Sequence, residues 1–285
     1  MTQVATKRFG AILIILATLA LSACTQMFFY PQKQHFNVPL DFGYTYQDIA
    51  LQTSDDLTLH AWLVDPNQEV IGTVYFLHGN AENISTHIRA VLWLVDLGYQ
   101  VLALDYRGYG QSAGTAKIPE VFEDIQAGAE WLEQHLQATD NQQPVYLLGQ
   151  SLGASLAISY AEQQGAGSEL FDALIVEAAF TRYGTIAKHV ASQHWLTWLF
   201  QYPAKWLFAK QYDPLDAIGK LSPLPVLLIH SPGDEVIPYA LGERLFKEAG
   251  EPKQFIQAEG RHIWAFAEKE TRQAVHEFMV RNSRE

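Results

Sequence analysis

Five short, continuously apolar runs constrain the fold of this chain more than any other feature of its sequence. They lie at residues 73–77, 101–104, 145–148, 174–176 and 226–229. Continuous hydrophobicity is typical of strands that are covered on both faces, as in parallel sheets. Helical patterns lie between the runs, at about residues 86–97, 119–136 and 152–162. This alternation predicts repeated β-α-β units in a mostly parallel, doubly wound sheet, an α/β fold.

The segments outside these runs complete the predicted domain. Residues 46–51 and 57–64 flank a turn-like Ser-Asp-Asp and predict an antiparallel opening hairpin. A last strand is expected at 255–257 and a closing amphipathic helix at 268–280. The interval 181–225 is too long for a connecting loop, so we expect an inserted helical cap there. With 48% hydrophobic residues, positions 46–285 are expected to form one domain.

The N-terminus carries a targeting pattern. Lys7 and Arg8 precede an apolar run at residues 9–23, and Cys24 follows as the only cysteine of the chain. The run is too short to span a bilayer and suits a secretory signal. Small residues before Cys24 resemble a bacterial lipobox, which implies removal of residues 1–23, lipidation of Cys24 and an anchor or linker over 24–45. The alternative is a buried free cysteine after an uncleaved anchor helix.

Charge limits the partners of the chain. The 31 acidic residues exceed the 19 basic ones, and the net charge of −12 argues against binding nucleic acid or adsorbing to anionic lipid. Membrane attachment is therefore expected through the acyl chains at Cys24. Thr25 follows the cysteine in place of the aspartate that marks inner-membrane retention. We expect a location in the bacterial cell envelope, on the outer membrane if the host is Gram-negative.

The motif Gly149-Gln150-Ser151-Leu152-Gly153 follows a predicted buried strand and opens a predicted helix. Such a turn needs glycines so that the serine hydroxyl can stand exposed at the end of the strand. In this setting the motif resembles the nucleophile turn of the α/β-hydrolase superfamily, which implies that Ser151 is the catalytic nucleophile. The alternative role for Ser151 is a helix N-cap.

In that superfamily the serine is followed along the chain by an acid and then a histidine. The order leaves His262, in a loop after the last strand, and His276, within the closing helix; we predict His262 as the base. Asp234 lies in a Gly-Asp-x-x-Ile-Pro-like turn after the strand at 226–229 and resembles the acid of the family. Glu235 and Glu177 are the rival acids.

Two further blocks extend the resemblance to about residues 73–266. Leu77-His78-Gly79-Asn80 resembles the oxyanion loop, which implies that the backbone N–H groups of Asn80 and Leu152 stabilise the oxyanion. His78 is expected to be structural. Residues 105–112 match the loop after the next strand, and we expect Arg107 to pair with a carboxylate there.

The chain most resembles lysophospholipase-like or monoacylglycerol-lipase-like serine hydrolases. Trp198 and Trp206 of the cap would either pack on the sheet domain or line an acyl pocket. The resemblance implies hydrolysis of a small-molecule carboxylic ester or thioester through an acyl-enzyme, without cofactor. No His-x-x-x-His or cysteine ligand spacing suggests a metal. The alternative function is a catalytically silent scaffold that serves as an envelope-binding module.

Overall fold

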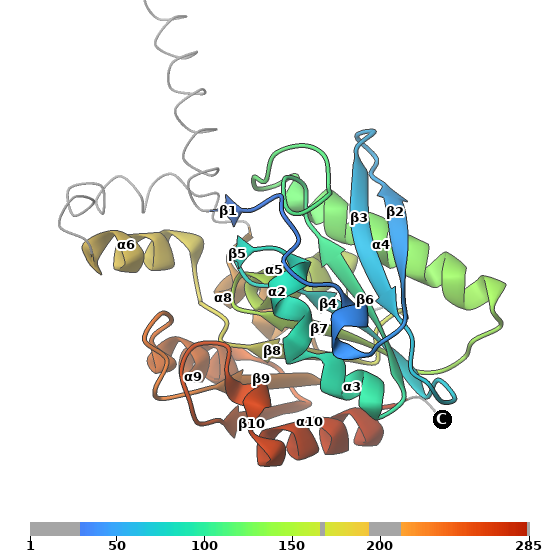
Figure 1. Cartoon of the computed structure of the whole chain (residues 1–285). Coiled ribbons are helices and arrows are strands. Elements are labelled where there is room, and N and C mark those ends of the chain that lie inside the picture. Colours follow the sequence, from blue (N-terminus) through green and yellow to red (C-terminus); the bar gives the residue numbers. More distant parts are fainter. Residues whose placement is uncertain (1–28, 166–168, 194–211, 284–285) are drawn as a thin grey trace, which may run out of the picture.

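The computed structural model describes residues 29–165, 169–193 and 212–283 (Figure 1). Eight strands form the main sheet: β2 (Tyr46–Gln52), β3 (Thr58–Val64), β4 (Gly72–Leu77), β6 (Tyr99–Asp105), β7 (Val145–Gln150), β8 (Ala173–Glu177), β9 (Val226–His230) and β10 (Lys253–Gln257). The α-helices in the described residues are α2 (Ile84–His87), α3 (Leu92–Asp96), α4 (Val121–Ala138), α5 (Leu152–Gln164), α6 (Tyr183–Gln193), α8 (Pro214–Ala217), α9 (Tyr239–Glu248) and α10 (Lys269–Arg281). Every predicted strand is present, with its ends displaced by at most two residues.

The main sheet has the order β10-β9-β8-β7-β4-β6-β3-β2. The six strands from β10 to β6 are parallel, whereas β3 is antiparallel to both of its neighbours. The predicted mostly parallel sheet with an opening antiparallel hairpin is therefore confirmed. Because the parallel strands share one direction, their carboxyl ends meet at one edge of the sheet, where ligands bind in folds of this kind.

Two hydrophobic cores lie on the two faces of this sheet. Along β4, Tyr75 and Leu77 point into the core shared with α4, α5 and α9, while Val74 and Phe76 point into the core shared with α3 and α10. Helices accordingly cover both faces in Figure 1. The continuous apolar runs of the sequence have this origin, because successive side chains of a strand enter opposite cores.

The helix predicted at 86–97 differs from the observed structure. The stretch is divided into α2, the 3₁₀ helix η2 (Ile88–Ala90) and α3. The tighter 3₁₀ turn changes the helical phase, so that Ile84, Ile88, Val91 and Leu94 are all buried in one core. Helix α9 was not predicted, although Leu241, Leu245 and Phe246 have helical spacing and pack in one core.

The expected linker over residues 24–45 is wrong for its described part, since residues 29–42 pack on the domain. We call these residues the N-terminal strap. Phe29 is buried, the short strand β1 (Tyr30–Pro31) pairs with β5 (Ala81–Glu82), and the 3₁₀ helix η1 (Pro39–Phe42) follows. The strap therefore lies beside the loop that follows β4. Residues 1–23 and Cys24 lie outside the described residues.

In the interval 181–225, the described residues contain α6, α8 and the 3₁₀ helix η5 (Ile218–Lys220). Arg182, just before α6, donates to the carboxylates of Asp213 and Asp216, which lie at the start of α8. This pairing joins the two ends of the interval. Trp198 and Trp206 lie outside the described residues. In the part of the chain that the structure describes, no helix combines the length and apolar character needed to cross a bilayer.

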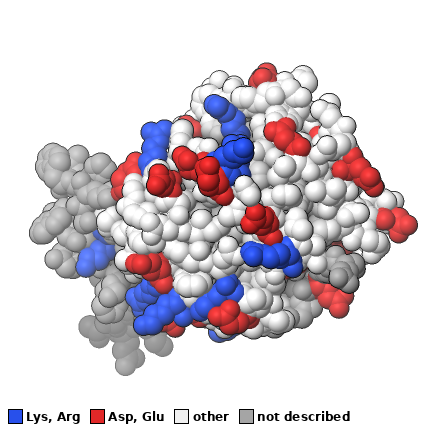
Figure 2. All heavy atoms as spheres, turned by 90° about the horizontal axis from the view of Figure 1, so that it is seen from below, with Lys and Arg blue, Asp and Glu red and all other residues white. Residues whose placement is uncertain are grey.

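The charged side chains are mixed on the face seen in Figure 2. Lys and Arg groups there alternate with Asp and Glu groups. Among the described residues in that view, no continuous basic surface of the kind that follows a phosphate backbone is visible.

The predicted pairing of Arg107 with a carboxylate is confirmed. Its Nε and Nη2 lie 2.8 Å and 2.7 Å from Oδ1 of Asp124, and its Nη1 lies 2.8 Å from Oδ2 of Asp55. The side chains of Arg107 and Asp124 are buried, whereas that of Asp55 is 44% exposed. The pair fixes the loop after β6 against α4.

We expect Asp124→Ala to lower the free energy of unfolding by about 3–5 kcal/mol, because it leaves the Arg107 charge buried without its main partner. Asp55→Ala is the matched control, and its loss should stay below about 1 kcal/mol, since water screens this exposed pair. Urea unfolding of both variants measures the difference. Equal losses in the two variants would contradict this account of the pair.

Candidate active site

Ser151 occupies a sharp turn between β7 and α5. Its backbone is in a strained conformation, with φ 55° and ψ −112°. The neighbouring glycines allow this turn to approach other backbone: a Cβ on Gly153 would lie 2.1 Å from the carbonyl oxygen of Leu77, and one on Gly149 would lie 2.5 Å from that of Gly153. The peptide N–H of Ser151 donates to the carbonyl of Glu177 at 2.8 Å. The serine side chain is therefore presented at the carboxyl end of the sheet.

The structure brings together the three side chains that the sequence selects as nucleophile, base and acid. Ser151 Oγ lies 2.9 Å from Nε2 of His262, and His262 Nδ1 lies 2.8 Å from Oδ2 of Asp234. His262 comes from the loop after β10, and Asp234 from the turn after β9. The carboxylate end of this series is the most deeply buried, since the Asp234 side chain is 1% exposed and that of His262 is 15% exposed.

The Asp234 carboxylate is held from several sides. Its Oδ1 accepts the backbone N–H groups of Val236 and Ile237, each at 2.8 Å. His230, which sequence analysis did not select, places Nε2 3.4 Å from Oδ2. Burial alone would raise the pKa of Asp234, but hydrogen bonds from His230 and His262 hold that pKa well below its ordinary value. The carboxylate is therefore charged at neutral pH and able to orient His262.

Because the pKa of Asp234 is lowered in the folded protein, this residue should affect how stability falls at acid pH. A carboxyl whose pKa is lowered by folding contributes stability that is complete above its unfolded pKa, here 3.8, and is lost as the pH falls below it. We expect the wild type to lose more unfolding free energy than Asp234→Asn between about pH 5 and about pH 2. Urea unfolding across this range measures the two slopes. Parallel slopes would contradict a lowered pKa at this site.

The two rival acids lie elsewhere. Glu177 is buried. Burial raises its pKa, although the hydrogen bond from Gln150 acts in the opposite direction. Its carboxylate accepts Nε2 of Gln150 at 2.5 Å and the backbone N–H of Ala265 at 2.8 Å. Glu177 therefore connects the serine turn to the loop of His262 rather than pairing with the imidazole. Glu235 is exposed beside Asp234. The sequence alone does not indicate this contact between Gln150 and Glu177, although Gln150 directly precedes Ser151.

The rival histidine, His276, lies on α10 with its ring 5.9 Å from that of Tyr99, so it packs against the sheet. Burial lowers the pKa of His78 to about 3, which keeps this ring neutral. Its Nδ1 donates to the carbonyl of Gly79 at 2.7 Å. These contacts agree with the structural role expected for His78.

Leu152 directly follows Ser151, and Asn80 lies in the loop after β4. The contact of Gly153 with the end of β4 brings the first turn of α5 against the loop that carries Asn80. Leu152 is the first residue of α5, a position whose N–H has no partner within the helix. The carbonyl of Asn80 accepts the hydroxyl of Tyr109 at 2.6 Å, and its side chain accepts the N–H of Tyr30 at 3.1 Å. The loop is therefore held in place by the N-terminal strap and by the loop after β6.

A hollow of about 420 Å³ lies away from these residues, at the amino ends of β7 and β8. Gln126, Glu130 and Asp172 are among its polar lining residues. Its position on the edge of the sheet opposite Ser151 separates it from the serine turn.

The fold and this serine turn define the chain as a hydrolase of the α/β-hydrolase superfamily. It belongs to the Hydrolase_4 family, described as serine aminopeptidase S33, whose model matches residues 68–220.

Among curated proteins, the chain is 29% identical to YfhR of Escherichia coli K12, over 92% of this chain and 90% of that protein. It is 27% identical to the lysophosphatidylserine lipase ABHD12 of Xenopus tropicalis, over 87% of this chain and 71% of the lipase. Among solved structures, the Pyrococcus furiosus esterase Pf2001 superposes with a TM-score of 0.70 at 21% identity, covering 89% of this chain and 97% of the esterase. This last similarity concerns the fold.

Proposed function

We propose that this protein is a serine hydrolase that cleaves carboxylic esters, or thioesters, through an acyl-enzyme. The observation that carries the proposal is the pair of short distances joining Ser151, His262 and Asp234, 2.9 Å and 2.8 Å. A serine hydroxyl is a weak nucleophile until a base removes its proton, and an oriented imidazole is such a base.

In the proposed reaction, Ser151 Oγ attacks the acyl carbonyl while Nε2 of His262 takes the hydroxyl proton. The imidazolium then gives this proton to the leaving alcohol as the ester bond breaks and the acyl-enzyme forms. Water, deprotonated by His262, attacks the acyl-enzyme, and the proton returns to Ser151 as the acid leaves. Asp234 fixes the tautomer of His262 and stabilises its charged form. Backbone N–H groups of Leu152 and Asn80 are the proposed donors to the oxyanion.

For the substrate, we propose a lipid-like ester or one with a short to medium acyl chain. Support comes from the relatives of this chain that are named lysophosphatidylserine lipases. A lipid anchor at Cys24 would hold the enzyme at the surface of the cell envelope, beside substrates of this kind.

Labelling with a fluorophosphonate probe tests the proposal. We expect wild type to be modified at Ser151, because the probe reacts with serine hydroxyls that a neighbouring base activates. Ser151→Ala should not be labelled, while Ser54→Ala, which changes an exposed loop serine, should be labelled like wild type. Mass spectrometry of the labelled peptides locates the adduct. A folded wild type without label at Ser151 would instead support the catalytically silent envelope-binding scaffold.

Hydrolysis rates on p-nitrophenyl esters of graded chain length, with lysophospholipids and monoacylglycerols alongside, would define the substrate. A preference for medium or long acyl chains is expected for a lipid-like substrate. A rate that falls with every added methylene would restrict the proposal to small esters.

A further inference from the structure

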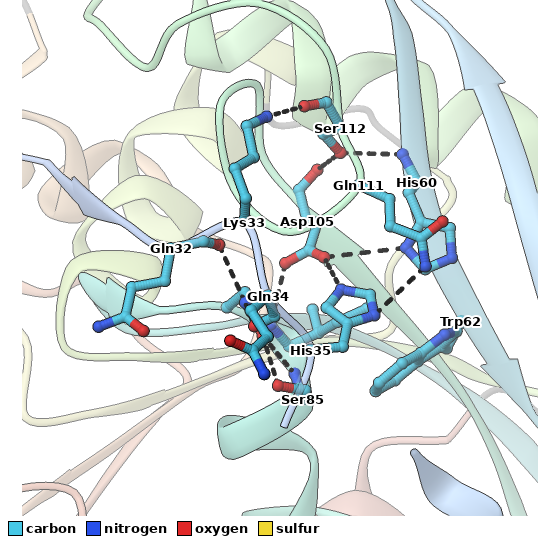
Figure 3. A network of polar contacts seen from close by, with 12 residues as sticks. Gln32, Lys33, Gln34, His35, His60, Trp62, Ser85, Asp105, Gln111 and Ser112 are labelled. Atoms are coloured by element: carbon cyan, nitrogen blue, oxygen red, sulfur yellow. Dashed lines mark hydrogen bonds and ion pairs between the residues drawn. The ribbon is translucent and has the colours of Figure 1, made fainter. Parts of the chain in front are cut away.

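Two histidines and an aspartate from three distant segments of the chain meet in one polar cluster (Figure 3). His35 comes from the N-terminal strap, His60 from β3 and Asp105 from the end of β6. Oδ2 of Asp105 lies 2.9 Å from Nε2 of His35 and 3.8 Å from Nδ1 of His60. One ligand atom from each side chain thus lies within 4.8 Å of the other two.

The hydrogen bonds around His60 leave one of its ring nitrogens directed at Asp105. Its Nε2 lies 2.7 Å from Oδ1 of Asp48, a contact that requires the proton to be on Nε2. Its Nδ1 is buried and has no hydrogen-bond partner among the described residues, and the side chain is 9% exposed. In the neutral ring, the Nδ1 lone pair therefore faces the negative Asp105 carboxylate, an arrangement that a cation between them would relieve.

Asp105 and His35 also direct one possible ligand atom each into this cluster. Oδ1 of Asp105 accepts the backbone N–H of Ile84 at 2.9 Å, which leaves Oδ2 for the group. Nδ1 of His35 lies 3.4 Å from the side-chain amide of Gln111, which can accept as well as donate a hydrogen bond after a flip. A Cβ on Gly110 would lie 1.9 Å from Oδ2 of Asp105, so only glycine allows this approach.

We propose that His35, His60 and Asp105 bind a divalent transition-metal ion of the Zn²⁺ class. Zinc is commonly bound by imidazole and carboxylate ligands, whereas Mg²⁺ and Ca²⁺ prefer sites made of oxygen ligands alone. Tetrahedral zinc ligands lie about 3.3 Å from one another, between the 2.9 Å and 3.8 Å observed here. The second ring nitrogens meet Asp48 and Gln111, as the outer partners of zinc-bound histidines do.

The role of this metal is structural. It joins the N-terminal strap to β3 and β6, and the strap in turn holds the side chain of Asn80 through the N–H of Tyr30. No metal was expected from the sequence, because these three ligands are far apart along the chain and only the fold brings them together. The inference does not depend on the proposed ester hydrolysis.

Metal binding by the full chain tests the site. The protein is stripped with a chelator, and Zn²⁺ and Co²⁺ are then added to wild type, His35→Gln, Asp48→Ala and the control His135→Gln, a surface histidine stacked on Trp131. We expect wild type and the control to bind one tight Zn²⁺, to show the visible absorption of tetrahedral Co²⁺ and to melt at a higher temperature with Zn²⁺.

His35→Gln should lose this binding by about 100-fold or more, and Asp48→Ala, which removes only the outer partner of His60, should weaken it by about 10-fold to 100-fold. Because Asp48 is exposed, this second variant keeps the test valid if His35→Gln does not fold. Wild-type affinity in both folded variants, or a wild type without the tight Zn²⁺ and the Co²⁺ absorption, would overturn the site.

Discussion

Replacing Ser151 with alanine is expected to lower kcat for a p-nitrophenyl ester by about a million-fold, the loss that follows when a serine nucleophile is removed. The reason is local: Ser151 Oγ is the atom that lies 2.9 Å from the His262 base, and alanine leaves that base without a nucleophile. Binding of the ester should change little, since the methyl group fits the space of the hydroxymethyl. Pre-steady-state and steady-state rates with a chromogenic ester measure the effect.

A second substitution at the same position separates catalysis from folding. Ser151 has φ 55°, a conformation that costs a residue with a side chain about 1–3 kcal/mol and costs glycine far less. Ser151→Gly should therefore be as inactive as Ser151→Ala but more stable by about 1 kcal/mol. Two stable, folded variants that keep more than about one per cent of wild-type activity would reject Ser151 as the nucleophile.

The sequence predicts the sheet well because its signals are local. The runs at 145–148 and 226–229 are apolar at every position, and the observed β7 and β9 contain them. The turn at Ser151 is equally local, since the two glycines that permit the close approach lie within two residues of it. The positions of Asp234 and His262 after their strands then follow from the rule that loops at the carboxyl ends of parallel strands share one edge.

Contacts between distant segments explain what the sequence did not predict. The N-terminal strap has no periodic pattern, and its place on the domain depends on pairs such as His35 with Asp105, which are 70 residues apart. The brace from Gln150 through Glu177 to Ala265 likewise spans segments that approach only after folding. Only the directions of its two oxygens show that Glu177 holds these segments together and does not pair with His262.

Replacing Asp234 with asparagine is expected to lower kcat by about ten-thousand-fold with little change in fold. The Asp234 carboxylate accepts from Nδ1 of His262 at 2.8 Å, and it keeps the proton on that nitrogen so that Nε2 can receive the proton of Ser151. An asparagine amide can donate to Nδ1 instead, which stabilises the opposite tautomer, and it brings no charge to stabilise the imidazolium.

The two neighbouring acids supply the controls for this experiment. Glu235→Gln changes an exposed carboxylate beside Asp234 and should leave kcat within about two-fold of wild type, as expected of a surface substitution. Glu177→Gln keeps an acceptor for Ala265 but places two amide groups against each other at Gln150, so its effect should be smaller than that of Asp234→Asn. If Glu177→Gln instead caused the ten-thousand-fold loss while Asp234→Asn stayed active, the acid would have been assigned to the wrong strand. The observed distances oppose that outcome, because it is the Asp234 carboxylate that contacts the imidazole.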